Sequence, residues 1–97
     1  MSQVQEKTRI NTYLSKRYRV VFWNDDKTTF DFVASCLVLI FGKTPDEAIR
    51  LTIDVDRKGK CIAGGGYILD VAKTKQREVL DRASEEGFPF QVTVEEE

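Results

Sequence analysis

The sequence predicts a two-layer α+β sandwich in which a three-stranded antiparallel sheet carries three helices on one face. Two observations indicate this class. Short runs of β-branched and aromatic residues alternate with longer segments whose apolar residues recur at helical spacing, in the order strand, helix, helix, strand, helix, strand. The chain also has 97 residues, which is enough for one domain with a thin core and leaves no room for a second.

A polar turn separates the first strand from the first helix. Residues 18–23 are mostly β-branched and aromatic, and the Asn24-Asp25-Asp26 segment after them is typical of a turn. The segment Thr28-Thr29-Phe30-Asp31 has the form of a capping box and therefore predicts a helix start. Apolar residues at helical spacing continue this helix to Phe41, and Gly42 predicts its end.

The second helix has a stronger start signal. Thr44 is a suitable N-cap, Pro45 fits the first helical position, and two acids then face the positive end of the helix dipole. An apolar stripe at helical spacing runs from Ala48 to Val55, and Gly59 predicts the end of this helix.

The remaining elements are predicted to be a short strand, a long helix and a final strand. Residues 60–63 form the strand, and the triple glycine of residues 64–66 predicts a tight passage into the next helix. That helix covers roughly residues 68–86, with Val71, Ala72, Val79 and Ala83 on its inner side. Apolar residues at positions 90, 92 and 94 alternate with polar ones, which predicts a half-exposed strand.

Composition and charge exclude several classes of function. Fifteen basic residues against sixteen acidic ones give a net charge of -1, which argues against nucleic acid as the main partner. Histidine is absent, which removes the commonest metal ligand and the commonest general base. The triple glycine lacks the lysine and the spacing of a phosphate-binding loop. We therefore expect no metal, no other cofactor and no enzymatic activity.

The cysteines and the first residues predict where the protein acts. Cys36 and Cys61 fall in an apolar helical stretch and a short strand, so we expect both to be buried and unpaired in a reducing cytosol. Residues 1–17 are polar and lack a sustained period, which predicts a flexible extension before a core of residues 18–97, and no signal peptide. No apolar run is long enough to span a bilayer, so we expect no membrane partner.

Two polar groups are candidates for a binding site. The simplest interpretation of Asn24-Asp25-Asp26 is a turn, because these residue types bond to their own backbone. The alternative is a cation site, since two carboxylates and an amide oxygen accept hydrogen bonds from an ammonium group. A divalent cation would need further oxygen ligands. Thr52 and Asp56 share a helix face, which is either a solvated polar edge or a second part of such a site.

Three segments together carry a family resemblance. Residues 18–28, YRVVFWNDDKT, form a strand that leads into Asn-Asp-Asp, a variable residue and threonine. Residues 70–75, DVAKTK, follow an acid-Val-Ala-x-x-Lys pattern, and Phe88-Pro89-Phe90 leads into a strand that ends in glutamates. In this order the segments resemble ClpS, the Clp protease adaptor family, over about residues 18–97.

The resemblance implies a binding role without catalysis. ClpS proteins hold the free α-amino group of a substrate, bury its large apolar first side chain and deliver it to a Clp ATPase. By that match, Asn24, Asp25 and Asp56 bind the substrate N-terminus. The wall of the side-chain pocket is formed by Thr28, Phe30, Val33, Thr52 and Phe90. Asp70 and Lys75 face the N-terminal domain of a ClpA or ClpC unfoldase, residues 1–17 take part in the handover, and the adaptor is a cytoplasmic monomer.

Three positions and one loop differ from the usual family pattern. Asp56 stands where the family usually has histidine, and its carboxylate also accepts from an ammonium group. Thr52 stands where the family usually has a methionine gate, so we expect a roomier pocket with a changed preference for the first side chain. Phe30 stands in place of a more flexible residue, and we expect it to oppose this change. The glycine loop is one residue longer than usual.

Three other functions remain as alternatives. A ClpS-like paralogue would dock on the N-domain of a Clp ATPase and inhibit or redirect it without binding N-degrons. The C-terminal domain of the ribosomal stalk protein shares the order of strands and helices but lacks the Asn-Asp-Asp turn. A carboxylate-pair hydrolase would need a cleft that the sequence does not indicate.

Overall fold

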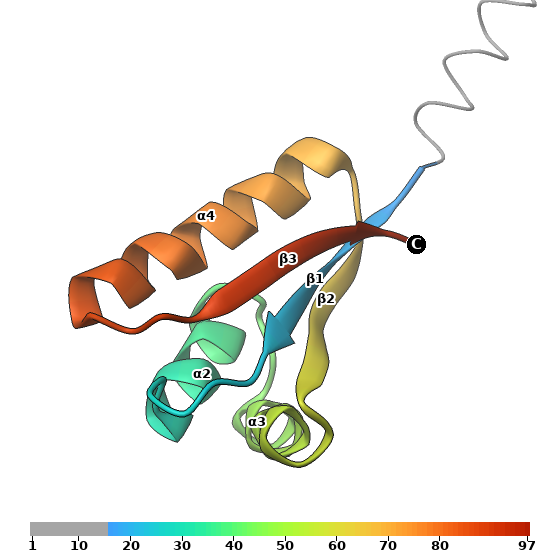
Figure 1. The fold of residues 1–97 in the computed structure, drawn as a ribbon. Coiled ribbons are helices and arrows are strands. Elements are labelled where there is room, and N and C mark those ends of the chain that lie inside the picture. The colour runs from blue at the N-terminus through green and yellow to red at the C-terminus, as the bar shows by residue number, and fades with distance from the viewer. Residues whose placement is uncertain (1–15) are drawn as a thin grey trace, which may run out of the picture.

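The computed structural model describes residues 16–97 and has the predicted order of strands and helices (Figure 1). The elements are β1 (Tyr18–Trp23), α2 (Phe30–Leu39), α3 (Pro45–Lys58), β2 (Lys60–Tyr67), α4 (Leu69–Glu86) and β3 (Gln91–Glu96). The predicted fold class is confirmed. Of the predicted extension, residues 1–15 lie outside the described part of the chain.

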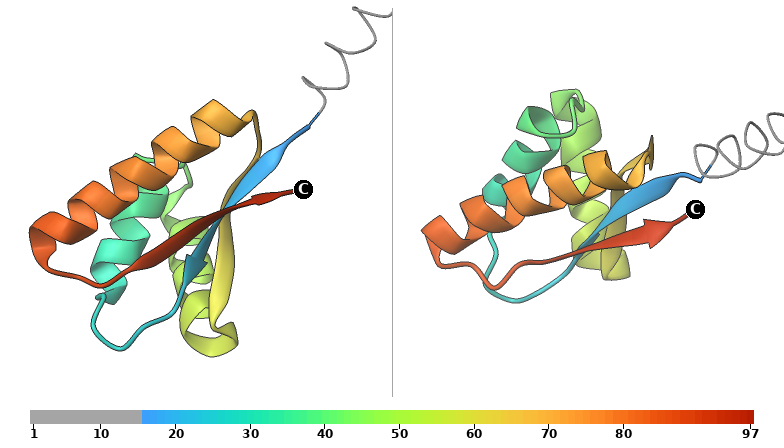
Figure 2. Two further views of the ribbon diagram at one scale, coloured as in Figure 1. Left: turned by 45° about the horizontal axis from the view of Figure 1, so that its top comes forward. Right: turned by 90° about the horizontal axis from the view of Figure 1, so that it is seen from above.

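The central strand of the sheet is β1, which pairs antiparallel with both neighbours in the order β2-β1-β3. Val20 and Phe22 are fully buried and pair with Val94 and Val92 of β3. Since alternate residues of a strand share a face, these side chains define the core side of the sheet. All three helices lie on that side (Figure 2), where they supply Leu37, Val55, Val79 and other apolar residues to a single core.

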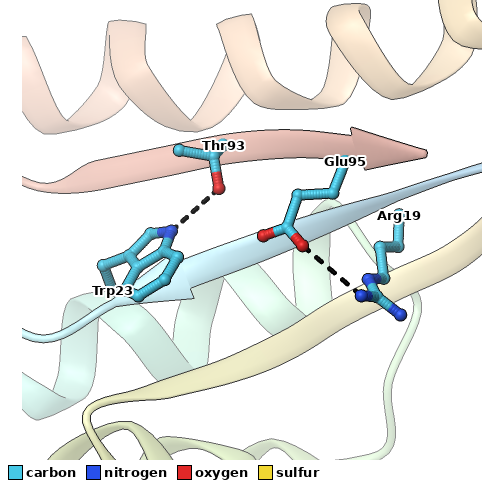
Figure 3. Close-up of polar contacts among 4 residues, drawn as sticks. All are labelled: Arg19, Trp23, Thr93 and Glu95. Atoms are coloured by element: carbon cyan, nitrogen blue, oxygen red, sulfur yellow. Dashed lines mark hydrogen bonds and ion pairs between the residues drawn. The ribbon is translucent and has the colours of Figure 1, made fainter. Parts of the chain in front are cut away.

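The opposite face of the sheet is covered by its own side chains. The indole Nε1 of Trp23 donates to the hydroxyl of Thr93 over 2.8 Å, and Arg19 and Glu95 form an ion pair at 3.4 Å (Figure 3). Val21 lies between Arg19 and Trp23 on this face and is only 2% exposed. This face therefore presents polar and amphipathic groups around the buried Val21, and side chains of α3 reach its edge at a cavity that Arg19 and Val21 also line.

The first helix begins differently from its predicted capping box. Thr29 is the N-cap of α2, and its hydroxyl accepts a hydrogen bond from the backbone N–H of Phe32 over 3.2 Å. Thr28 donates its hydroxyl to Asp25 and is not the N-cap, but the helix starts within the predicted segment, at Phe30. The helix also ends at Leu39, before the predicted Phe41.

The second helix keeps its predicted signals. The hydroxyl of Thr44 accepts from the backbone N–H of Glu47 over 3.2 Å, with Pro45 at the first helical position. Gly59 ends the helix with φ 89°, a left-handed conformation that glycine adopts without steric cost.

The triple glycine lies inside β2, which corrects the prediction of a strand that ends at residue 63. The register between β2 and β1 shifts twice along this stretch, as at a β-bulge. A Cβ on Gly64 would meet the hydroxyl of Tyr67 and, at 2.9 Å, the ring of Phe41. A Cβ on Gly65 would lie 2.5 Å from a carboxylate oxygen of Glu97. The missing side chains therefore make room for residues that pack over the strand.

The long helix α4 buries Ala72, Val79 and Ala83 as predicted, but Val71 is 39% exposed. The prediction that Val71 faces inward was wrong. Ala72 lies on the side of α4 that faces the core. Val71, one residue earlier, is rotated away from the core because successive helical residues are about 100° apart.

Candidate functional site

The ends of the strands bring several predicted site residues together. Trp23, the last residue of β1, pairs with Gln91 at the start of β3. Asn24 follows it, and the backbone N–H of Asn24 donates to the carbonyl of Gly59 over 2.9 Å. Phe90 directly precedes β3. Asn24, Gly59 and Phe90 therefore lie at the same end of the sheet, where the three strands start or finish.

Asp56 lies on α3, close in the chain to this end of the sheet. Asp56 lies three residues before Gly59, which is about one helical turn along the axis. Its side chain is exposed and forms no hydrogen bond or ion pair with another residue of the described range, 16–97. On the same helix, Asp54 pairs with Lys58 at 3.7 Å. The carboxylate of Asp56 is thus available to a ligand.

The carboxylate of Asp25, in contrast, holds the turn after β1. Its Oδ1 accepts from the backbone N–H groups of Lys27 and Thr28 over 2.8 and 2.7 Å, and its Oδ2 accepts from the hydroxyl of Thr28 over 2.7 Å. Partial burial raises the pKa of Asp25, but the three hydrogen bonds together lower it by more, so the pKa lies below its ordinary value. The charged carboxylate therefore stabilises the turn, and a second lone pair on Oδ2 remains for a ligand.

Three of the predicted pocket residues are buried. Phe90 is 5% exposed, and its ring centroid lies 4.9 Å from that of Phe22. Val33 on α2 belongs to the same core cluster. Thr52 is 3% exposed and donates its hydroxyl to the carbonyl of Ala48 over 2.7 Å, so its interpretation as a solvated polar edge was wrong. Because this bond satisfies the hydroxyl within α3, Thr52 offers its methyl group for apolar contacts.

The other two predicted pocket residues are more accessible. Thr28 is half-buried and bonded to Asp25. Phe30, the first residue of α2, is 44% exposed. It is the one phenylalanine in the described range without a partner ring, since the others form edge-to-face pairs. An unpaired ring next to the polar turn is suited to contact a ligand.

Four surface cavities in the described part of the chain are lined mostly by residues outside the predicted pocket. Among the predicted pocket residues only Phe90 lines one of these four. That cavity is a groove of about 500 Å³ lined by Trp23, Leu80, Phe90, Gln91, Val92 and Thr93. Sequence reasoning missed it. The exposed Leu80 on the otherwise polar side of α4 is the signal that could have indicated it.

The two residues predicted to face an ATPase have different surroundings. Asp70 is exposed in the first turn of α4. Lys75 is half-buried, and its Nζ donates to the carbonyl of Ile40 over 2.8 Å. The same Nζ lies 5.6 Å and 5.5 Å from the ring centroids of Phe41 and Tyr67, within the range of a cation–π contact. Lys75 therefore connects α4 to the end of α2.

Within residues 16–97, the acidic and cysteine side chains form no group of three that could hold a metal ion. In the same range, no helix is both long and apolar enough to cross a membrane.

These observations define a small α+β domain with a polar turn at one end of its sheet, an unpaired carboxylate on α3 and an unpaired aromatic ring at the start of α2. A family model described as ATP-dependent Clp protease adaptor protein ClpS matches residues 14–93. The chain belongs to the ClpS family of Clp protease adaptors.

Individual relatives agree with this assignment. The ATP-dependent Clp protease adapter protein ClpS of Neisseria gonorrhoeae is 43% identical over 88 residues, which cover 91% of this chain and 84% of the relative. The protein of the same name from Acetivibrio thermocellus is 39% identical over 94 residues, which cover 97% and 94%. The solved structure of Agrobacterium tumefaciens ClpS2 bound to L-phenylalaninamide has a TM-score of 0.80 and 34% identity, and covers 86% of this chain and 99% of that one.

Proposed function

We propose that this adaptor binds the N-terminal residue of substrate proteins and delivers them to a Clp ATPase for degradation. The observation that carries the proposal is the meeting of Asn24, Phe90 and the end of α3 at one end of the sheet. The unpaired Asp56 stands three residues before that end of α3, and we infer that its carboxylate serves the same site. A free N-terminus has the complementary chemistry, because its ammonium group donates three hydrogen bonds beside the first side chain. The ligand of Agrobacterium tumefaciens ClpS2, L-phenylalaninamide, also combines an amino group with an aromatic side chain.

The roles of the residues follow from their surroundings. Asp56 and the oxygen of Asn24 accept from the ammonium group, and the remaining lone pair of Asp25 takes part while its other bonds keep the turn in place. Thr28 and Phe30 form the rim of the pocket, and Val33, Thr52 and Phe90 form its apolar wall. Since the hydroxyl of Thr52 is already bonded, this wall favours apolar over polar first residues.

The expected affinity is moderate. Burial of a Leu or Phe side chain contributes roughly 1.5–3 kcal/mol. Each hydrogen bond to the charged ammonium group contributes about 1.5–3 kcal/mol. One buried side chain with two such bonds therefore supports binding in the range of about 1 mM to 1 μM. Reversible binding of this strength suits an adaptor that must release its substrate.

Docking on the ATPase uses another part of the molecule. We assign the direct contact with the N-domain of a ClpA- or ClpC-type unfoldase to Asp70, which is exposed at the start of α4. Lys75 holds this end of α4 in place through its bond to Ile40. The protein then acts in the cytoplasm as a monomer, without nucleic acid or membrane partners, and residues 1–17 take part in the handover.

Calorimetric titration tests the proposal with short peptides that begin with Phe, Leu, Ile or Ala, each with a free or acetylated N-terminus. Free Phe and Leu peptides should bind, and acetylation should weaken binding by at least about tenfold, because it removes the charge and two of the three N–H donors. Failure of every free peptide to bind would overturn the proposal.

A substitution separates the charge of Asp56 from its size. Asp56→Asn keeps the shape of the side chain and should weaken the binding of free Phe peptides by about tenfold, as expected for loss of a charged acceptor. Asp46→Asn is the matched control, because Asp46 is an exposed acid at the opposite end of α3. Equal affinities for both variants would remove Asp56 from the site.

The alternative is a ClpS-like adaptor that docks on the ATPase and redirects it without binding N-degrons. The observation that favours it is the use of the Asp25 carboxylate within its own turn. Firm association with the N-domain of a Clp ATPase, without binding to any peptide, would support this alternative.

A further inference from the structure

The groove beside Phe90 runs along an edge of the sheet, and we call it the β3 groove. It is lined by Trp23, Leu80, Phe90, Gln91, Val92 and Thr93 and has a volume of about 500 Å³. The outer edge strand β3 forms its floor, and α4 lies alongside (Figure 1). None of these six lining residues carries a charge, although 32% of the residues in the chain are charged.

The β3 groove is continuous with the proposed N-terminus site. Phe90 belongs to both, since it is a predicted wall of the first-residue pocket and a lining residue of the groove. Trp23 pairs with Gln91 across the strands and is followed by Asn24, whose turn is the proposed acceptor for the ammonium group. Asn24 therefore directly follows a residue that lines the groove, so a peptide held at Asn24 would begin beside it.

The dimensions of the groove suit a short peptide segment. Its lining follows the strand from Phe90 to Thr93. Three extended residues span about 10 Å, which matches this length of strand. The volume also lies within the range of about 300–1,000 Å³ that is usual for ligand pockets.

One contact indicates how a peptide would pack there. The side-chain amide of Gln76 donates to the backbone carbonyl of Val92 over 2.7 Å. This bond occupies the outward acceptor of the strand, so a ligand does not simply add a fourth strand at this point. Binding would instead come from side chains that pack on the indole of Trp23 and on Leu80, which is 36% exposed.

We propose that the β3 groove binds residues 2 to 4 of a substrate polypeptide and favours uncharged apolar side chains at these positions. The inference rests on the proposed function, because the first residue must be held at Asn24 and Phe90 for the chain to enter the groove. It adds a second determinant of substrate choice, read from the residues that follow the N-terminal one.

The test compares three ligands on the full chain: L-phenylalaninamide, Phe-Gly-Gly-Gly-amide and Phe-Leu-Ile-Leu-amide. The first two should bind with similar affinity, and the third should bind at least about fivefold more tightly, because burial of even part of a leucine contributes about 1 kcal/mol. Trp23 is the single tryptophan of the chain, so its fluorescence reports on the groove without ambiguity. It should change with Phe-Leu-Ile-Leu-amide and stay constant with L-phenylalaninamide.

A matched pair of variants locates the effect. Leu80→Glu should abolish the gain of Phe-Leu-Ile-Leu-amide over Phe-Gly-Gly-Gly-amide, whereas Leu39→Glu should preserve it. Leu39 is an exposed leucine at the end of α2 that does not line the β3 groove. Equal affinities of both tetrapeptides for the wild type, with constant Trp23 fluorescence, would overturn the inference while the proposed function stands. Failure of L-phenylalaninamide and of both peptides to bind would overturn the two together.

Discussion

Asp25 and Asp56 carry the same chemical group in different surroundings. Asp25 accepts three hydrogen bonds from Lys27 and Thr28, so most of its bonding capacity is used within the turn. Asp56 is exposed and unpaired within the described range. The sequence indicated both residues as acceptors but could not predict this division of roles, because it depends on the conformation of residues 25–28.

The turn role of Asp25 predicts a pH-dependent loss of stability in Asp25→Asn. At about pH 7 the variant should be less stable by about 1 kcal/mol, because two backbone N–H groups lose a charged acceptor. The pKa of Asp25 is lowered in the folded state, so its contribution is present above about pH 4, its unfolded value, and is lost as pH falls through the folded pKa. Urea unfolding should show the difference from wild type shrinking below about pH 4.

Asp26→Asn is the control for this experiment, because Asp26 is exposed and lies in the same turn. It should change stability by less than about 0.5 kcal/mol at any pH. A deficit of Asp25→Asn that stays constant down to the acid limit would contradict the role of its charge.

The buried thiols predict a second residue-scale result. Burial raises the pKa of Cys36 to about 11, although Arg82 opposes the shift. Burial raises the pKa of Cys61 to about 12, with Asp54 adding to the shift and Lys43 opposing it. Because the thiolate is the reactive form, the folded protein should react with iodoacetamide at about pH 8 far more slowly than the urea-unfolded protein.

The same shifts predict the alkaline limit of stability. A raised folded pKa stabilises the protein below the unfolded value of about 8.5, and this contribution is lost as pH rises toward the folded pKa. The free energy of unfolding should therefore fall above about pH 9 in the wild type and fall less in Cys36→Ala/Cys61→Ala. Rapid alkylation of the folded wild type at about pH 8 would contradict the burial argument.

At the scale of elements, local signals predicted most boundaries. Thr44 with Pro45 starts α3 and Gly59 ends it, as the sequence indicated, because capping is a contact between residues close in the chain. The length of β2 could not be predicted in this way. Its glycines resemble a loop locally, and they form a strand by pairing with the distant β1, while Tyr67 and Glu97 occupy the space beside Gly64 and Gly65.

The glycines of β2 provide a test of that packing. Gly64→Ala should lower stability by about 1–3 kcal/mol, because its Cβ would meet the rings of Tyr67 and Phe41 in a packed region. Gly65→Ala should lower it by less than about 1 kcal/mol, because its Cβ meets only the carboxylate end of the Glu97 side chain, which can move away at the cost of its one hydrogen bond to the backbone N–H of Gly66. Thermal and urea unfolding of the two variants measure this difference. Equal losses would show that strand propensity rather than packing limits these positions.

At the scale of the whole molecule, the sheet decides which distant residues meet. The register that places Trp23 opposite Gln91 brings Asn24 and Phe90 to one end, although 66 positions separate Asn24 from Phe90 in the numbering. Periodicity alone does not specify register, so the resemblance to ClpS, not spacing, indicated that these residues share a site. The β3 groove could not be predicted for the same reason, because Leu80 and Trp23 line one cavity only after α4 has packed beside β3.

Lys75 joins two distant parts of the fold and gives the test at this scale. Its Nζ donates a charged hydrogen bond to the carbonyl of Ile40 and lies over the rings of Phe41 and Tyr67. Lys75→Met keeps the apolar stem and removes the charge, so stability should fall by about 1–2 kcal/mol. The loss is measured by urea unfolding.

Lys73→Met is the matched control, because Lys73 is an exposed lysine on the same helix and should change stability by less than about 0.5 kcal/mol. Binding to the N-domain of a Clp ATPase then separates structure from recognition. Asp70→Asn should weaken binding without loss of stability, since Asp70 is exposed. Lys75→Met should weaken binding only through loosening of the start of α4, and the loss of affinity should be accompanied by faster hydrogen exchange in that segment. If Lys75→Met abolished binding with unchanged stability and exchange, Lys75 would be a direct contact and its bond to Ile40 would have to open on docking.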